Sequence, residues 1–294
     1  WSSVKQKIFE LLNNQRYGFR LGLHIKDLNT GDIIAFNENL LFASASLVKI
    51  PIALTFYYDL YSKKIDITKP PLYLKKHRSA GSGILKNESA NRYVHFHDLM
   101  YYMLSNSDNT ATNILTDLVG MQRVNQICQQ FGWKNTNMSR FVMDLHLRKR
   151  GIENYTTPFE MADMFEKLFN GQFINKNIST EILCYMLNPY VDDRIPRFLP
   201  KNIDVIHKTG LILDNAHDVG IIYLPGNQPV LISAFVDNIG NDYFIAKNLI
   251  GDIARIIYEH STTYHQAPLK KRAGQFYNAP KLKKQKKIKK TKKN

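Results

Sequence analysis

Several features that would assign a chain to a familiar class are scarce or absent here. Only two cysteines occur, Cys128 and Cys184, in separate helix-like segments whose spacing suggests no metal site, so we expect two buried free thiols rather than a disulfide. No run of about 18 uncharged apolar residues is present, which argues against a membrane-spanning helix. No internal repeat is found, and no signal peptide precedes Trp1, so we expect that a leader segment has been removed.

Acidic residues are missing from the C-terminal end. From Lys270 to Asn294 there are twelve Lys or Arg and no Asp or Glu, so removing them takes the net charge from +15 to +3. We predict that residues 269–294 form a basic, disordered tail. Such a tail suits an anionic polymer, an anionic membrane surface or nucleic acid, and its alternative is a mere solubility tail.

The remaining chain has the apolar content of a packed domain. Hydrophobic residues make up 44% of the sequence, alternating near both ends and following helical spacing between them. The predicted strands are Phe19–Asp27, Ile33–Phe36, Ile203–Lys208, Val219–Leu224 and Val230–Asp237. The predicted helices are Ser2–Arg16, Ser46–Tyr61, Phe96–Ser105, Thr110–Val119, Met121–Phe131, Thr157–Phe169, Ser179–Leu187 and Tyr243–His260.

This order predicts an α/β fold of the α+β type. Strands from both ends of the chain form one antiparallel sheet flanked by the terminal helices, with an all-helical lobe inserted between them. We expect one domain over residues 1–268, divided into a sheet lobe (1–42 and 200–268) and a helical lobe (43–199).

Three short motifs carry the chemistry. Ser46-Leu-Val-Lys49 opens an apolar helix, where a lysine three residues on shares the serine's helix face and backbone N–H groups favour an oxyanion. A serine needs such a base to become a nucleophile. Ser107-Asp-Asn109 lies between two helices, and Lys208-Thr-Gly210 ends a strand. Each motif alone also fits a helix cap or a strand end.

The set, in this order and 61 and then 101 residues apart, resembles the serine, lysine and asparagine motifs of class A β-lactamases and penicillin-binding proteins. Thr156-Thr-Pro-Phe-Glu-Met161 looks like the segment that opens a helix after their omega loop. Asn215–Gly220 resembles their turn into the next core strand. The resemblance covers about Phe19 to His260 and implies a serine β-lactamase/transpeptidase-like fold.

The resemblance also assigns catalytic roles. Ser46 would attack a carbonyl and form an acyl-enzyme, with Lys49 as its proton acceptor or relay. Ser107 would pass a proton to the leaving nitrogen. Lys208 would lower the pKa of the Ser107 hydroxyl and attract a substrate carboxylate. The oxyanion hole would consist of the backbone N–H groups of Ser46 and Leu211.

Substrate-binding roles fall to four other positions. Asn109 would bind the substrate's side-chain amide and also Lys49. Thr209 would bind the carboxylate, with Gly210 completing the motif. Arg194 occupies a stretch where some relatives place a carboxylate-gripping arginine; the alternative is a surface arginine.

One expected residue is missing. Class A enzymes activate the deacylating water with an omega-loop glutamate, and that position falls at Phe141 or Val142 here. Asp144 is the nearest carboxylate, either shifted into the glutamate's role or capping its segment. Glu153 is expected to be solvated. Asn154 stands where the partner of Arg140 is expected.

The prediction is therefore a bacterial, monomeric serine hydrolase that is secreted or periplasmic. It would act on β-lactam rings, as an antibiotic-resistance enzyme does, but with slow deacylation. A penicillin-binding-protein-like peptidase or esterase acting on cell-wall peptides is the first alternative. A catalytically idle domain with a polyanion-binding tail is the second. His95 and His97 lack a third ligand nearby, so we expect no metal and no cofactor.

Overall fold

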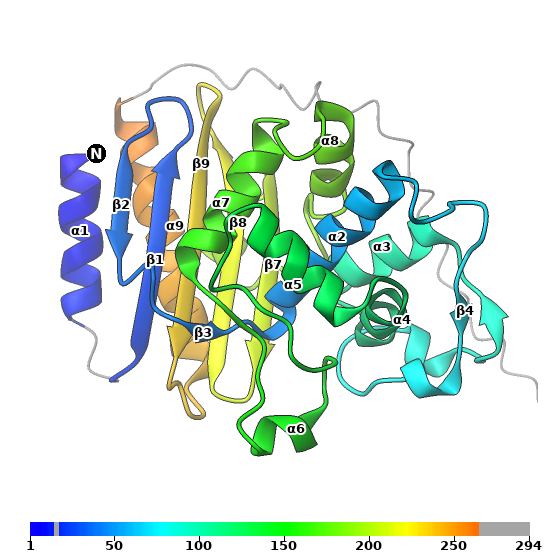
Figure 1. Ribbon diagram of the computed structural model, residues 1–294. Helices are drawn as coiled ribbons and strands as arrows, with labels where there is room; N and C mark the ends of the chain where they lie inside the picture. Colours follow the sequence, from blue (N-terminus) through cyan, green and yellow to red (C-terminus); the bar gives the residue numbers. More distant parts are fainter. Residues whose placement is uncertain (15–17, 265–294) are drawn as a thin grey trace, which may run out of the picture.

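The computed structural model describes residues 1–14 and 18–264, and strands from both ends of the chain meet in one five-stranded sheet (Figure 1). The strand order is β2-β1-β9-β8-β7, and every neighbouring pair is antiparallel. The strands are β1 (Arg20–Asp27), β2 (Ile33–Phe36), β7 (Val205–Ile212), β8 (Asn215–Leu224) and β9 (Gln228–Asp237).

The alternation in β1 explains its two faces. Leu21, Leu23 and Ile25 point to one side and join an apolar cluster with the terminal helices. His24 and Lys26 point to the other, where Lys26 forms an ion pair with Glu166 at 2.7 Å. Because successive side chains of a strand alternate between faces, this pattern fixes which face each helix covers.

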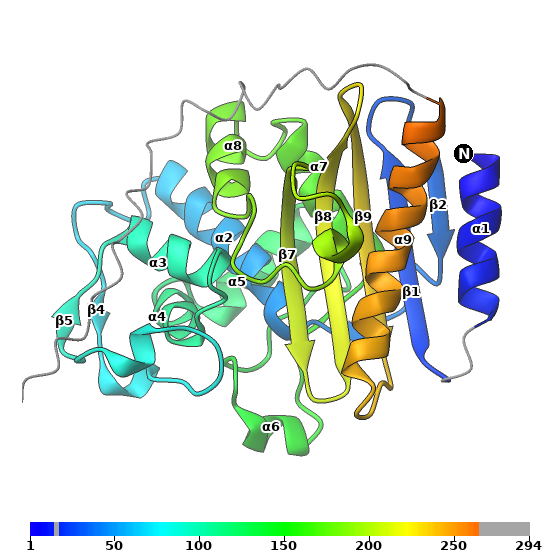
Figure 2. The ribbon, with the colours of Figure 1, turned by 180° about the vertical axis from the view of Figure 1, so that it is seen from behind.

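Helices cover both faces of the sheet. Figure 2 shows α9 (Tyr243–Tyr264) lying across one face with α1 (Ser2–Asn13) beside it. On the other face α7 (Pro158–Phe169) packs against the sheet, and beyond it the helical part of the molecule begins (Figure 1). The central helix there, α2 (Lys49–Tyr61), is buried along most of its length because its sequence is apolar on nearly every side.

The remaining elements surround α2 or connect it to the sheet. The further helices are α3 (Phe96–Leu104), α4 (Asn109–Val119), α5 (Met121–Gln130), α6 (Leu145–Lys149) and α8 (Lys176–Cys184). Short strand pairs are β3 (Phe42–Ala43) with β6 (Tyr155–Thr156), and β4 (Leu72–Tyr73) with β5 (Arg92–Tyr93). The 3₁₀ turns are η1 (Ala45–Val48), η2 (Lys75–His77), η3 (Leu85–Asn87) and η4 (Ile195–Phe198).

The predicted fold class is confirmed: one antiparallel sheet, flanking helices and a helical region between its strands. Both cysteines are free, Cys128 buried and Cys184 partly exposed. No helix among the described residues is long and apolar enough to cross a bilayer. The predicted tail at 269–294 lies outside the described residues.

One prediction about the sheet is wrong. Residues 215–220 were expected to be a turn, but they lie within β8, and the turn is only Leu213 and Asp214. His217 and Asp218, which the resemblance placed in that turn, are fully buried and hydrogen-bonded inside the sheet. The close packing of β7 and β8 is shown at Gly220, where an added Cβ would lie 2.4 Å from the Cβ of His207.

Candidate active site

Ser46 lies in η1, where the sheet meets the helical region. The residue before it, Ala45, has φ 47°, a left-handed conformation that costs energy in a non-glycine residue and that often occurs at functional sites. Ser46 is only partly buried. Gly210 on β7 packs closely against this segment, because an added Cβ there would lie 3.2 Å from Leu47 and 3.3 Å from Ala45.

The side chain of Lys49 ends beside the Ser46 hydroxyl. Its Nζ lies 2.9 Å from Ser46 Oγ, 2.8 Å from the backbone oxygen of Ser107, 3.0 Å from Ser107 Oγ and 2.8 Å from Asn109 Oδ1. Lys49 itself is completely buried. The structure thus brings together four of the residues that the motifs singled out, from two segments about sixty positions apart.

These contacts are compatible with a neutral amine. The backbone oxygen of Ser107 and Asn109 Oδ1 only accept hydrogen bonds, so they can take the two N–H groups that a neutral lysine offers. Its lone pair then remains for a hydroxyl proton. Burial, the charge of Lys208 and, in the opposite sense, Asp108 set the pKa of Lys49 well below its usual value. An unprotonated amine 2.9 Å from a hydroxyl can accept its proton.

The loop before α4 fixes Ser107 and Asn109. Ser107 has φ 53°, and Asp108 caps α4 by accepting from the N–H of Ala111 at 2.9 Å. The second oxygen of Asp108 accepts from the N–H of Ile84 at 2.7 Å. Asn109 Nδ2 donates to the backbone oxygen of Ala80 at 2.8 Å. Both ends of the Asn109 amide are therefore held by protein groups.

Lys208 approaches Ser107 from the sheet. It is buried in β7, and its Nζ lies 3.0 Å from Ser107 Oγ and 3.0 Å from the backbone oxygen of Thr209. Burial lowers the pKa of Lys208 to about 7, with Asp218 acting to raise it and Arg194 to lower it. The Ser107 hydroxyl therefore lies between two buried amines.

The outer edge of β7 carries Leu211. The N–H of His207 donates across this edge to Met186, and backbone groups of alternate strand residues point to the same side. The N–H groups of Thr209 and Leu211 are thus directed to the same outer edge, beside η1. The Leu211 side chain is 44% exposed, so the structure leaves this stretch of edge accessible.

Arg194 precedes η4 and is buried, so the expectation of a surface arginine is wrong. Its Nη1 lies 2.8 Å from Asp193, and its positive charge acts on the pKa of Lys208. Thr209 is also mostly buried, on the same strand as Lys208. A cationic region therefore borders the end of the site that the resemblance assigns to a carboxylate.

His217 is a residue that the sequence did not point to. Its Nε2 donates to the backbone oxygen of Ala43 at 2.9 Å, and its Nδ1 accepts from the N–H of Val236 at 3.3 Å. Burial lowers the pKa of His217 to about 4, so the ring is neutral at physiological pH. This histidine fixes the short strand that leads into Ser46.

The segment expected to hold a water-activating carboxylate is apolar. Val142 is buried, and Met143 lies against Gly81, next to Asn109. Asp144 caps α6, accepting from the N–H of Leu147 at 3.0 Å. Among the described residues, no hydrogen bond joins Asp144 to Ser46 or Lys49.

Glu153 is buried, so the expectation that it is solvated is wrong. It lies 2.5 Å from Arg140 Nη2 and 3.0 Å from Arg148 Nε, so it is the ion-pair partner of Arg140. Asn154 instead holds the backbone of Arg140, accepting from its N–H at 3.0 Å and donating to its carbonyl oxygen at 3.1 Å. Arg148 also reaches Asp214 in the β7–β8 turn at 3.0 Å. These four charges hold α6 and its flanking loop to the sheet.

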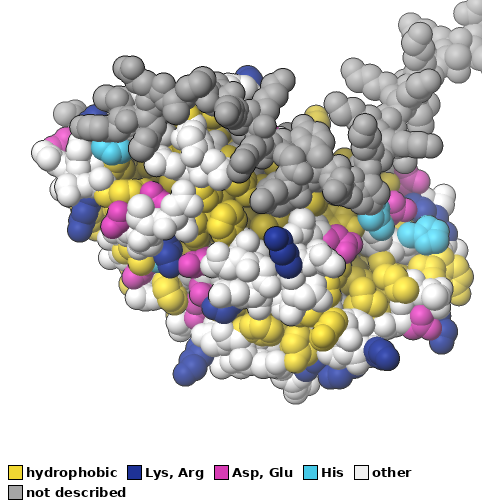
Figure 3. Space-filling view, turned by 90° about the horizontal axis from the view of Figure 1, so that it is seen from above, with side chains coloured by type: hydrophobic (Ala, Val, Ile, Leu, Met, Phe, Trp, Pro, Cys, Tyr) yellow, Lys and Arg dark blue, Asp and Glu magenta, His cyan; other side chains and the backbone are white. Residues whose placement is uncertain are grey.

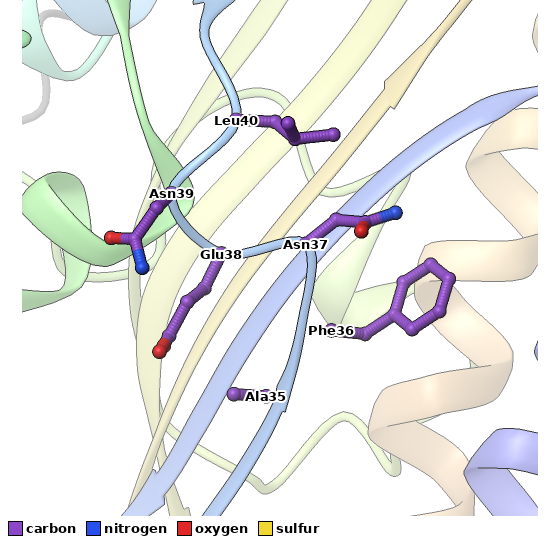
Figure 4. A pocket seen from close by; sticks show the side chains of 6 residues that line it. All are labelled: Ala35, Phe36, Asn37, Glu38, Asn39 and Leu40. Carbon is purple, nitrogen blue, oxygen red and sulfur yellow. The ribbon is translucent and has the colours of Figure 1, made fainter.

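A shallow pocket occupies the opposite edge of the sheet, away from Ser46. Figure 4 shows the side chains of Glu38 and Asn39 directed away from those of Phe36 and Asn37, so the polar groups do not converge. No group of three metal-binding side chains occurs in residues 1–14 and 18–264. The lining residues are Ala35, Phe36, Asn37, Glu38, Asn39 and Leu40.

Comparison with known proteins gives a consistent result. Residues 3–261 match the model of the beta-lactamase enzyme family. Beta-lactamase VEB-1 of Pseudomonas aeruginosa is 27% identical over 82% of this chain and 85% of its own length. A beta-lactamase of Streptomyces fradiae is 26% identical over 83% of this chain and 82% of its own.

Solved structures agree. The crystal structure of a beta-lactamase from Sphaerobacter thermophilus has a TM-score of 0.78 at 27% identity, covering 90% of this chain and 98% of that one. A mutant of PBP-A, solved as an acyl-enzyme complex with penicillin G, has a TM-score of 0.81 at 24% identity, covering 89% of this chain and 97% of that one. At this low identity, the likeness to PBP-A shows the fold alone.

The Arg140–Glu153 pair should hold the loop strongly. Glu153→Ala leaves the buried Arg140 guanidinium without its carboxylate, and breaking such a pair costs about 3–5 kcal/mol. Urea unfolding measures the loss. Asp252→Ala, which removes an exposed ion pair with Arg255 on α9, should cost less than about 1 kcal/mol. Equal losses of unfolding free energy in the two variants would contradict the role assigned to the Arg140–Glu153 pair.

Proposed function

The chain belongs to the beta-lactamase enzyme family, and on that basis we propose that it is a serine hydrolase that opens β-lactam rings through an acyl-enzyme on Ser46. The observation that carries the proposal is the position of the buried Lys49 amine, 2.9 Å from Ser46 Oγ. A periplasmic or secreted location, where β-lactams and cell-wall substrates occur, is part of the proposal.

The reaction begins with substrate binding along the edge of β7. The substrate carboxylate lies against Lys208, Thr209 and Arg194, while its carbonyl oxygen accepts from the N–H groups of Ser46 and Leu211. Lys49 then takes the Ser46 proton as Oγ attacks the carbonyl carbon. These contacts are supported by the burial of the two cations and by the direction of the Thr209 and Leu211 N–H groups toward the outer edge of β7.

Opening of the ring breaks the carbon–nitrogen bond. The Ser107 hydroxyl gives its proton to the departing nitrogen and recovers one from the amines beside it. Lys49 and Lys208 both lie 3.0 Å from Ser107 Oγ, so either amine is within reach. The product of this half-reaction is an ester on Ser46 and a free amine on the opened ring.

Hydrolysis of that ester is the slow half-reaction in this proposal. The attacking water must lose a proton, but Phe141 and Val142 occupy the position where class A enzymes keep a glutamate. Asp144 is occupied as a helix cap.

A penicillin-binding-protein-like peptidase or esterase activity on cell-wall substrates is the second candidate, since PBP-A has the same fold. A catalytically idle domain is the third candidate. It is excluded if Ser46 becomes acylated.

Ser46 should be the sole acylation site. A fluorescent penicillin should label the protein, and Ser46→Ala should abolish labelling because no other hydroxyl has the Lys49 amine and the oxyanion donors together. Lys49→Ala should slow acylation by roughly 10²–10⁴-fold, the usual contribution of a positioned base. Ser62→Ala, at the opposite end of α2, should label like the parent. Equal labelling of Ser46→Ala would refute the assignment.

Deacylation should be slower than acylation, so that a covalent adduct accumulates. A positioned general base contributes roughly 10²–10⁴-fold to such a step, and none is in place here. Mass spectrometry of the protein with a penicillin, followed over time, measures both phases. Val142→Glu should speed loss of the adduct because it supplies a carboxylate. Val142→Gln, whose side chain has the shape of glutamate but no basic carboxylate, should not.

Two results would contradict slow deacylation. One is rapid turnover of a chromogenic cephalosporin with no detectable adduct. The other is trapping of the adduct by Asp144→Asn in a protein that otherwise turns over quickly, because asparagine also caps helices and the change would remove only the carboxylate's basicity.

The basic tail is proposed to add affinity for polyanions. Where Figure 3 leaves the described residues in view, Lys and Arg side chains are scattered among acidic and apolar ones and form no basic patch. A chain ending at residue 268 should acylate normally and lose salt-sensitive binding to vesicles containing phosphatidylglycerol. Equal salt dependence in the full and shortened chains would refute the proposal. Parallel assays with DNA distinguish nucleic acid from lipid.

A further inference from the structure

A second polar cluster lies behind the catalytic groups, on the side of the sheet that carries α9. Asp218 on β8 is fully buried, and both of its carboxylate oxygens lie within 3.0 Å of His207 Nδ1. The same carboxylate accepts from the N–H of Ile195 at 3.0 Å. The proposed mechanism assigns no role to either Asp218 or His207.

The neighbours of Asp218 connect it to both substrate-binding cations. His207 directly precedes Lys208 in β7, and Ile195 directly follows Arg194 at the start of η4. The Asp218 carboxylate therefore fixes the backbone N–H of Ile195, next to Arg194, and the side chain of His207, next to Lys208. Because Lys208 and Arg194 are both almost fully buried, neither is stabilised by bulk water.

The charge of Asp218 has the sign that these cations need. It favours the charged forms of Lys208 and Arg194, whereas their burial disfavours both, and Arg194 in turn disfavours charge on Lys208. Asp193 supplies a second carboxylate to Arg194 and is shared with Lys247 of α9. Lys208 is also faced by Ser107 and, from α2, by Lys49, whose charge would oppose its own.

We propose that Asp218, held by His207, is a positioning residue: the buried counter-ion that keeps Lys208 and Arg194 charged and in place beneath the substrate carboxylate. This inference rests on the proposed function for its effect on catalysis. Its electrostatic part concerns the folded protein alone.

Asp218→Asn tests the charge while keeping the shape. The pKa of Lys208 should fall by about one unit, because the negative charge of Asp218 favours the protonated amine and the substitution removes it. Side-chain ¹⁵N NMR titration of the full chain measures this directly, with Lys208→Met identifying the signal. The basic limb of the pH profile for acylation by a fluorescent penicillin should move to lower pH by the same amount, and acylation by an esterified penicillin should change less.

The control is Asp59→Asn, which removes a similarly buried carboxylate, paired with Arg123 at 2.7 Å in the helical region. It should lower stability without moving the Lys208 titration. His207→Gln, which leaves the charge of Asp218 but removes its nearest support, should shift Lys208 in the same direction by a smaller amount. It also serves as the test if Asp218→Asn does not fold.

An unchanged Lys208 titration in a folded Asp218→Asn variant would overturn the proposal. If that variant does not fold, an unchanged titration in His207→Gln would overturn it. If the unmodified protein is never acylated, the proposed function fails, yet the NMR titration still decides the role of Asp218.

Discussion

The removal of the Lys49 amine from water is the constraint on which the site depends. A lysine in water is protonated and useless as a base, so the protein must bury it and hold it beside the hydroxyl with hydrogen-bond partners. The apolar α2 provides the burial. The loop of Ser107 and Asn109 provides the partners, and its left-handed turn at Ser107 brings both a hydroxyl and a carbonyl to one nitrogen. The helical region is, in this sense, an enclosure for one side chain.

Much of this could be predicted from the sequence, because it depends on local patterns. The two-residue period gave β1 and β2, and the spacing of three between Ser46 and Lys49 put both on one turn. The order of the three motifs, through the resemblance, then predicted that Lys208 lies beside Ser107 in the same site. Predictions were weakest where polar residues are buried. His217 and Asp218 were assigned to a turn on the resemblance, and nothing in the sequence marks Ala43 and His207 as their hydrogen-bond partners.

The loop containing α6 shows the same limit. Glu153 was expected in solvent because nothing local marks it as buried, yet two arginines converge on it, one of them continuing to Asp214, over sixty positions later. Long-range ion pairs leave no periodic trace in a sequence. The left-handed Ala45 was likewise unpredictable, since alanine has no intrinsic preference for that conformation and surrounding contacts impose it.

The pairing of β1 with β9 has a consequence for biosynthesis. Arg20 lies opposite Asp237, so more than two hundred residues must leave the ribosome before β1 gains its second neighbour. Until then the nascent chain exposes an apolar strand edge, and closing so long a loop is slow because the entropy is lost before the contact forms. The protein therefore reaches its native state only after synthesis is nearly complete, and until then chaperones meet an incompletely folded chain.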